Sequence, residues 1–263
     1  MRVFISADIE GCCGVTHWDE ANKAHGDYPR FQAQMQREVS AACEAAVAAG
    51  ATTIRVRDAH ASARNLDPWA LPEPAHLVRE WSSHPQMMVQ DLDATFDALV
   101  LIGYHSPAGS GGNPLSHTLT GRYFDIRVNG QRMAELHLYA RMAAVLGVPT
   151  VAVTGDEVLC ALAAEEDSRT RTVASGAGRG RSMLARHPAA VVRDIRATVE
   201  QGLRQPFAPE APVGPFHLSV TFRDHREAYR AGFYPGATLS GDRVVEIVVD
   251  EWIDILRALL FWT

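Results

Sequence analysis

Acidic and histidine side chains follow three separate apolar segments near the start of the chain. They are Asp8 and Glu10 at the end of segment 3–9, Asp58 and His60 after 54–56, and His105 after 98–103. If the segments are parallel strands with right-handed crossovers, their carboxyl ends meet at one edge of a sheet. Carboxylate oxygens and imidazole nitrogens would gather there, and both bind divalent metals in proteins. The pattern therefore predicts a metal site at the edge of a parallel sheet.

The pair Asp8 and Glu10 is the strongest candidate for metal binding. Alternate residues of a strand point to the same face, so these two carboxylates point together while Ile9 enters the core. A carboxylate on a buried strand end is costly unless it is paired or bound to a metal. The alternative is a strand end held by salt bridges, but few basic residues lie nearby in the sequence.

The two histidines and a later glutamate are weaker candidates when taken singly. His60 and His105 could each be an ordinary loop histidine, and Asp58 could orient a metal-bound imidazole from behind. Glu135 begins a predicted helix, where a carboxylate could also serve as a cap that interacts with the helix dipole. Their convergence on one edge of the sheet favours the functional interpretation.

His117 follows the glycine-rich segment 107–114, which we expect to be a mobile loop with little buried surface. It could be a polar loop residue. The functional alternative is a general acid or base that the loop carries over the site.

Alternating strand and helix patterns predict an α/β fold, with a mostly parallel sheet flanked by helices and a smaller C-terminal α/β lobe. The expected strands are 53–56, 123–128, 148–154, 216–222 and 244–249, and the expected helices are 31–47, 136–146, 188–203 and one from about Glu251. The glycine-containing stretch 169–181 is expected to be a connection. We predict a metal-binding catalytic lobe in 1–165 and a smaller lobe in 166–263, or one continuous domain.

Composition and motif searches exclude several classes of protein. The chain has 25 basic and 31 acidic residues and a net charge of -6, which disfavours nucleic-acid binding. The chain has no apolar run of about 18 residues, so no membrane span is predicted, and it has no signal-peptide pattern and no CxxC spacing. The expectation is a reduced cytoplasmic protein. Motifs for dinucleotide, P-loop and serine-hydrolase chemistry are absent.

Five motifs, in this order, resemble those of the DppA-type D-aminopeptidase family, a group of zinc metallopeptidases. They are Ala7-Asp8-Ile9-Glu10-Gly11, Asp58-Ala59-His60, Gly103-Tyr104-His105, Ser116-His117 and Ala134-Glu135-Leu136. Thr154-Gly155-Asp156 fits the same pattern. Any one of these motifs would be weak, whereas their order along most of the chain is specific.

The resemblance implies a set of site residues and an assembly. It implies two zinc ions per subunit, a catalytic His117, and metal ligands at Asp8, Glu10, His60, His105 and Glu135. It also implies a homodecamer built from rings, whose active sites face an internal channel and cleave short peptides, including D-Ala-D-Ala. Three carboxylates and a bridging hydroxide would balance the charge of two Zn²⁺ ions, as a site of low dielectric constant requires.

The predicted function is a zinc-dependent aminopeptidase that removes the N-terminal residue, expected to be a D-amino acid, from short peptides. One alternative is a dinuclear metal-dependent phosphoesterase or amidase. A phosphoesterase would need Arg or Lys around the phosphoryl oxygens, and the motifs offer only Arg57 and Arg64. The other alternative is a non-catalytic binding subunit that metals stabilise.

Overall fold

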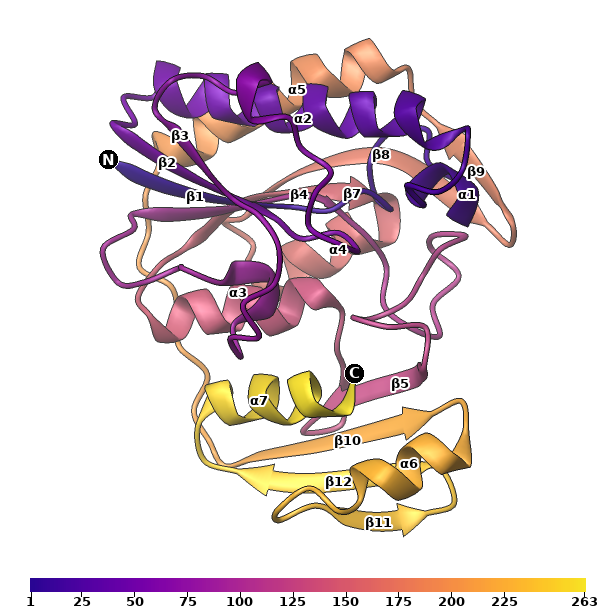
Figure 1. Ribbon diagram of the computed structural model, residues 1–263. Helices are drawn as coiled ribbons and strands as arrows, with labels where there is room; N and C mark the ends of the chain where they lie inside the picture. Colours follow the sequence, from indigo (N-terminus) through magenta and orange to yellow (C-terminus); the bar gives the residue numbers. More distant parts are fainter.

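The computed structural model describes residues 1–263 and contains a larger, mostly parallel sheet (Figure 1). The strand order is β3-β2-β1-β4-β7-β8-β9. The bounds are β1 Arg2–Ala7, β2 Thr53–Asp58, β3 Ala75–Val78, β4 Ala98–Tyr104, β7 Thr150–Asp156, β8 Arg171–Arg179 and β9 Ser182–Ala185. Only the β8–β9 pair is antiparallel. The predicted fold class is confirmed, and β1 lies between β2 and β4.

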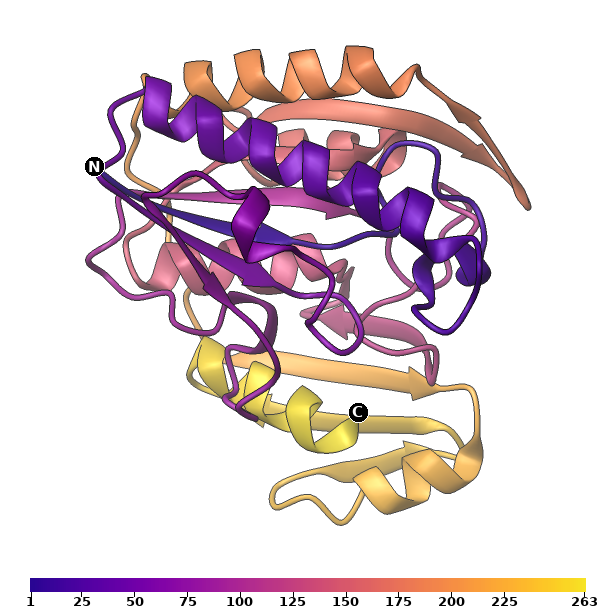
Figure 2. The same cartoon turned by 45° about the horizontal axis from the view of Figure 1, so that its top comes forward.

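Helices cover both faces of this sheet (Figure 2). One face carries α2 (Tyr28–Ala48) and α5 (Pro188–Leu203), and the other carries α3 (Glu135–Val145) and α4 (Glu157–Glu166). Strand β1 alternates between the two cores: Val3, Ile5 and Ala7 pack with α2, whereas Phe4 belongs to the opposite cluster. This alternation follows from the two-residue period of a strand.

A smaller antiparallel sheet lies beyond α3, with the order β11-β12-β10-β5-β6. Its elements are β5 Tyr123–Val128, β6 Gln131–Arg132, β10 Phe216–Phe222, β11 Thr238–Gly241, β12 Val244–Val249, α6 His225–Ala231 and α7 Trp252–Trp262. The apolar face of α7 packs against this sheet and against α3. The Trp252 indole N–H also donates a 2.9 Å hydrogen bond to the Leu138 carbonyl.

The two sheets divide the chain differently from the predicted boundary at residues 165 and 166. Elements β8, β9 and α5 follow residue 165 but join the first sheet, whereas β5 and β6 precede it and join the second. One cluster of 38 buried residues also connects α3 with α7 and the second sheet. The division into lobes 1–165 and 166–263 stays a prediction.

Two local expectations were wrong. The stretch 169–181 contains strand β8, because Gly176 and Gly178 serve close packing and not a turn. A Cβ atom on Gly178 would lie 2.4 Å from the Gly112 carbonyl oxygen. The loop 107–114 is also partly buried, since Gly178 donates a 3.2 Å hydrogen bond to Gly112 and the Asn113 side chain is enclosed.

Short elements complete the chain. They are α1 Trp18–Ala21 and the 3₁₀ turns η1 Pro68–Ala70 and η2 Met87–Val89. All four cysteines are free and buried. None of the helices combines the length and the apolar character needed to cross a membrane.

Glu38 of α2 is a fully buried carboxylate, and we expect Glu38→Gln to stabilise the protein. Its Oε1 accepts hydrogen bonds from Cys13 N at 2.9 Å and Gln34 Nε2 at 2.8 Å, while Oε2 has no partner. Burial raises the pKa of Glu38, although hydrogen bonds from Gln34 and Cys13 partly oppose this. A carboxyl group whose pKa is higher in the folded than in the unfolded state stabilises the folded protein at low pH. This contribution is lost as the pH rises through the folded-state pKa.

The gain for Glu38→Gln should therefore be larger at pH 8 than at pH 4.5, and of order 1 kcal/mol, the scale of one poorly satisfied buried group. Thermal unfolding at the two pH values measures it. Glu44→Gln on the exposed side of the same helix is the control, and it should change stability by less than about 0.5 kcal/mol. A variant less stable than wild type at pH 8 would contradict the argument.

Candidate metal centre

Five side chains meet at the carboxyl edge of the larger sheet, four of them at the strand ends where the sequence pattern placed them. Asp8 and Glu10 follow β1, His60 follows β2, His105 follows β4, and Glu135 is the first residue of α3. All five are at least nine-tenths buried. We call them the ligand cluster. They meet because β1 lies between β2 and β4, while α3 begins under the same edge.

The ligand cluster consists of two groups that share Asp8. Asp8 Oδ1 lies 3.3 Å from His60 Nδ1, and Asp8 Oδ2 lies 3.5 Å from His105 Nε2. Glu10 Oε2 lies 3.0 Å from His60 Nδ1, so Asp8, Glu10 and His60 form one group. Glu135 Oε2 lies 3.5 Å from His105 Nε2, so Asp8, His105 and Glu135 form the other.

Backbone carbonyls orient both histidine rings. His60 Nε2 lies 2.8 Å from the Ala21 carbonyl oxygen, and His105 Nδ1 lies 3.0 Å from that of Ser106. A carbonyl only accepts hydrogen bonds, so these ring nitrogens carry the proton in the neutral tautomer, as their partners assign it. The other nitrogen of each ring then points a lone pair at carboxylate oxygens, which are acceptors too.

Three buried atoms at the centre of the cluster have no hydrogen-bond partner. They are Glu10 Oε2, His105 Nε2 and Glu135 Oε2. Buried polar atoms are almost always satisfied, so three such acceptors within one cluster fit the binding of a cation there. Nitrogen and oxygen donors at this spacing fit a divalent metal of the zinc type.

The charges of the cluster favour positive species. Burial lowers the pKa of His105, but Glu135 and Asp8 outweigh burial and raise it to about 10. For His60 burial also opposes the shift, and Glu10 and Asp8 raise its pKa well above the usual value. The three carboxylates therefore attract either protons or metal ions to the same nitrogens.

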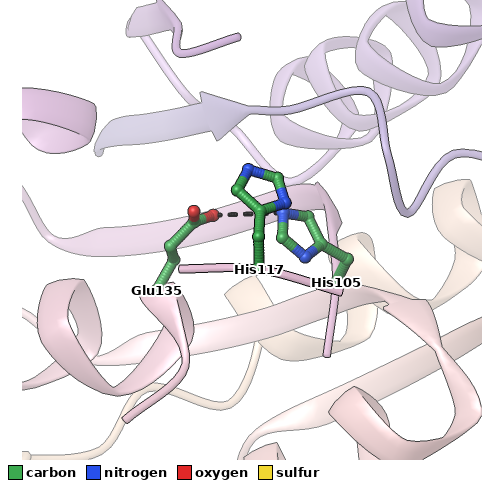
Figure 3. Close-up of side chains that lie close together, drawn as sticks. All are labelled: His105, His117 and Glu135. Atoms are coloured by element: carbon green, nitrogen blue, oxygen red, sulfur yellow. Dashed lines mark ion pairs between the residues drawn. The ribbon is translucent and has the colours of Figure 1, made fainter. Parts of the chain in front are cut away.

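His117 lies beside the cluster on the loop that follows β4 (Figure 3). Its ring stacks on His105, with centroids 4.3 Å apart and planes 17° apart, and the ring of Trp18 contacts it at 5.2 Å. His117 Nδ1 lies 2.8 Å from the Leu115 carbonyl oxygen, which leaves Nε2 available. Ligand atoms of His117, His105 and Glu135 lie within 4.8 Å of one another. The site places an imidazole where it could transfer a proton.

Asp156, to which the sequence argument assigned no role, supports His105 indirectly. Its Oδ2 accepts a 2.7 Å hydrogen bond from Ser106 N, and its Oδ1 accepts from Ser106 Oγ at 2.5 Å and from Leu159 N at 2.9 Å. Asp156 thus caps α4 and fixes the residue whose carbonyl orients His105. In the sequence, Asp156 could have been recognised as an acidic residue at the end of a further apolar strand, β7.

Asp58 acts differently from the expectation that it orients an imidazole. Its carboxylate accepts hydrogen bonds from Asn65 N at 2.5 Å, Asn65 Nδ2 at 2.7 Å and Leu66 N at 2.8 Å. Asn65 Nδ2 also donates to the His60 carbonyl at 2.8 Å. Asp58 therefore shapes the loop that carries His60, while the Ala21 carbonyl orients the ring.

Two glycines of the motifs allow β1 and β4 to approach closely behind the cluster. A Cβ atom on Gly11 would lie 1.7 Å from the Tyr104 carbonyl oxygen. Gly103 has a φ of +70°, and a Cβ atom there would lie 2.2 Å from the Asp8 carbonyl oxygen. Both motifs need glycine for steric reasons.

Comparison with known proteins agrees with this geometry. The family model Peptidase_M55, D-aminopeptidase, matches residues 1–261. The chain belongs to the D-aminopeptidase family. A curated D-aminopeptidase from Bacillus subtilis (strain 168) is 27% identical over 271 residues, covering 100% of this chain and 97% of that protein.

A solved structure supports the same assignment for this family member. It is the Zn-dependent D-aminopeptidase DppA from Bacillus subtilis, a self-compartmentalizing protease. It matches with a TM-score of 0.93 and 25% identity over 100% of this chain and 96% of that one. The predicted family, fold and D-aminopeptidase type of enzyme are therefore confirmed. The assignment of individual ligands and of His117 stays a prediction.

Proposed function

We propose that this chain is a zinc-dependent aminopeptidase that removes the N-terminal D-amino acid from short peptides. In this proposal the ligand cluster would hold two zinc ions per subunit, and Asp8 would contribute to both sites. The observation that carries the proposal is the pair of groups around Asp8, in which each carboxylate oxygen faces a different histidine. The family match and the Zn-dependent structural relative support both zinc and the reaction.

The site residues have separate roles in the proposed peptide hydrolysis. Bound zinc would supply a Lewis acid that polarises the peptide carbonyl and activates water near neutral pH. The carbonyls of Ala21 and Ser106 hold the two ligand imidazoles in the tautomer that presents a lone pair. His117 lines the cavity and would deliver a proton to the leaving amine through Nε2, while stacking on His105 keeps its ring in place.

The phosphoesterase alternative is not favoured. The cavity at the cluster is lined by 18 residues, and no arginine or lysine is among them. Arg57 lies over the Trp81 ring and donates to the Glu80 carbonyl, and Arg64 pairs with the Glu80 carboxylate. A phosphoryl group would therefore lack the positive side chains that stabilise its oxygens.

Metal analysis of the purified protein is the direct test of the site. We expect two zinc ions per subunit, and hydrolysis of short D-aminoacyl peptides but not of phosphate esters. A fully inert protein that still holds metal would support the non-catalytic binding subunit instead.

N-acetylated di- and tripeptides should be poor substrates compared with peptides that have a free α-amine. A carboxylate of the cluster can hold the ammonium, and acetylation removes this interaction. We expect kcat/KM to fall at least about 10-fold, a loss of about 1.4 kcal/mol. Parallel assays of D-Ala-D-Ala and its N-acetyl form measure it. Equal rates would identify an endopeptidase or amidase.

We further propose that the subunits form a homodecamer in the cytoplasm. The support is the resemblance to a self-compartmentalizing relative and the presence of four free cysteines. Light scattering should give a mass about ten times that of the subunit. A monodisperse monomer at micromolar concentration would remove the internal channel from the proposal.

A further inference from the structure

The cavity lined by Asp8, Glu10, His60 and Glu135 of the ligand cluster has an apolar wall. The cavity measures about 440 Å³, which suits a short peptide or another small ligand. Its large apolar side chains are Trp18, Trp81, Met87, Met88, Leu119 and Leu260. We propose that this wall binds the side chain of the substrate's N-terminal residue and selects large apolar or aromatic residues over alanine. The inference rests on the proposed aminopeptidase function and adds the class of substrate.

The position of the wall relative to the cluster determines which side chain it contacts. In the proposed reaction the N-terminal residue would place both its amine and its carbonyl on the cluster, and its side chain would branch from the carbon between them. Met88 lines the same cavity as Asp8 and Glu10, and its carbonyl accepts a 2.6 Å hydrogen bond from Ser6 Oγ, which connects this segment to β1. Trp81 and Met87 extend the same wall. These residues belong to segment 80–88, which we call the pocket segment and which would contact a substrate side chain that extends along this wall.

A buried arginine holds the pocket segment in place. The Arg57 guanidinium lies 4.2 Å from the centre of the Trp81 ring, and its Nη1 donates a 2.5 Å hydrogen bond to the Glu80 carbonyl. The Trp81 indole N–H donates a 2.7 Å hydrogen bond to the Ala61 carbonyl. The ring is therefore fixed before substrate binds, and a rigid aromatic surface loses little entropy on binding.

Backbone strain is concentrated in the same segment. Glu80, Ser83 and Met87 have φ values of 62°, 63° and 39°, in the left-handed region that disfavours residues other than glycine. Leu119, which also lines the cavity, has a φ of 63°, and its N–H donates a 2.7 Å hydrogen bond to Glu135 Oε1. Such strain persists where surrounding contacts enforce it, and it clusters at functional sites. Two of these four residues belong to the apolar wall.

The chemistry of the wall predicts the order of substrates. An alanine methyl group would leave most of the wall in contact with water, whereas leucine or phenylalanine would cover it. A lysine side chain would find no carboxylate in the pocket segment that faces the cavity, since the residues of this segment that line it are Trp81, Ser83, His84, Met87 and Met88. One methylene in an apolar pocket changes kcat/KM by roughly 10- to 200-fold.

The test compares D-Ala, D-Leu, D-Phe and D-Lys p-nitroanilides, which share one leaving group. We expect kcat/KM for D-Leu and D-Phe to exceed that for D-Ala by about 10-fold or more, with D-Lys lowest. An equal or higher value for D-Ala would overturn the inference and leave the aminopeptidase function standing.

Variants of the wall make the test specific. Trp81→Ala and Met87→Ala should lower kcat/KM for D-Phe by about 10-fold and leave D-Ala within about 2-fold. Trp69→Ala is the control, because Trp69 is 90% exposed and does not line the cavity, and it should change neither substrate. An equal loss on both substrates in the wall variants would contradict a role in selection.

A binding measurement separates this inference from the proposed function. If no aminoacyl substrate is cleaved, the aminopeptidase function fails. Calorimetry with D-phenylalanine amide and D-alanine amide then tests the wall alone. Tighter binding of the phenylalanine amide, weakened by Trp81→Ala, supports the inference, and equal affinities overturn it.

Discussion

Asp8→Ala is expected to release both metals from the protein and to reduce peptidase activity below detection. Both oxygens of Asp8 are engaged, one towards His60 and one towards His105, so no other side chain can replace it in either group. Elemental analysis and an activity assay measure the two effects. Normal metal content in this variant would disprove the shared position of Asp8.

Glu10→Ala and Glu135→Ala are matched comparisons for this prediction. Each removes a carboxylate that pairs with a different histidine, because Glu10 Oε2 lies 3.0 Å from His60 Nδ1 and Glu135 Oε2 lies 3.5 Å from His105 Nε2. We expect each to retain one metal ion where Asp8→Ala retains none. Circular dichroism should show a native fold in all three, since removing one of several repelling buried carboxylates does not open a large apolar cavity. If all three variants lost the same amount of metal, a single site would explain the cluster better.

His117→Ala is expected to keep its metals and its fold while kcat falls by about 10²-fold or more, the usual scale of general acid–base catalysis. The reason is the position of His117, which stacks on His105 at the side of the cluster and lines the cavity. Steady-state kinetics and metal analysis of the same preparation provide the measurement. KM should change little, because the proton is transferred after binding.

Two outcomes would refute that role for His117. Unchanged turnover would exclude catalysis, and loss of metal would make His117 a ligand together with His105 and Glu135, whose donor atoms lie within 4.8 Å of it. His76→Ala is a suitable control, since His76 is exposed on β3 and does not line the cavity. Its kinetics and metal content should match wild type.

The sequence by itself was sufficient for the central part of the sheet and for the residue types of the cluster. Strands β1, β2 and β4 are short apolar runs whose period and ends are local properties. Parallel strands joined by right-handed crossovers have their carboxyl ends at one edge of the sheet. Asp8, Glu10, His60 and His105 could therefore be assigned to one edge from their positions alone. Glu135 and His117 needed the family resemblance.

Only the tertiary structure decided which groups complete the site. The Ala21 and Ser106 carbonyls that orient the two imidazoles, and Asp156 behind Ser106, carry no local pattern. Strand β8 carries no clear local pattern either, because its Gly178 is typical of a loop in the sequence but packs against Gly112 in the folded protein. Periodicity reports how each residue is buried along its own element. Partners far apart in sequence are chosen by packing between elements, so the pairing of β5 with β10 and the wall opposite the cluster emerge only when the chain is folded.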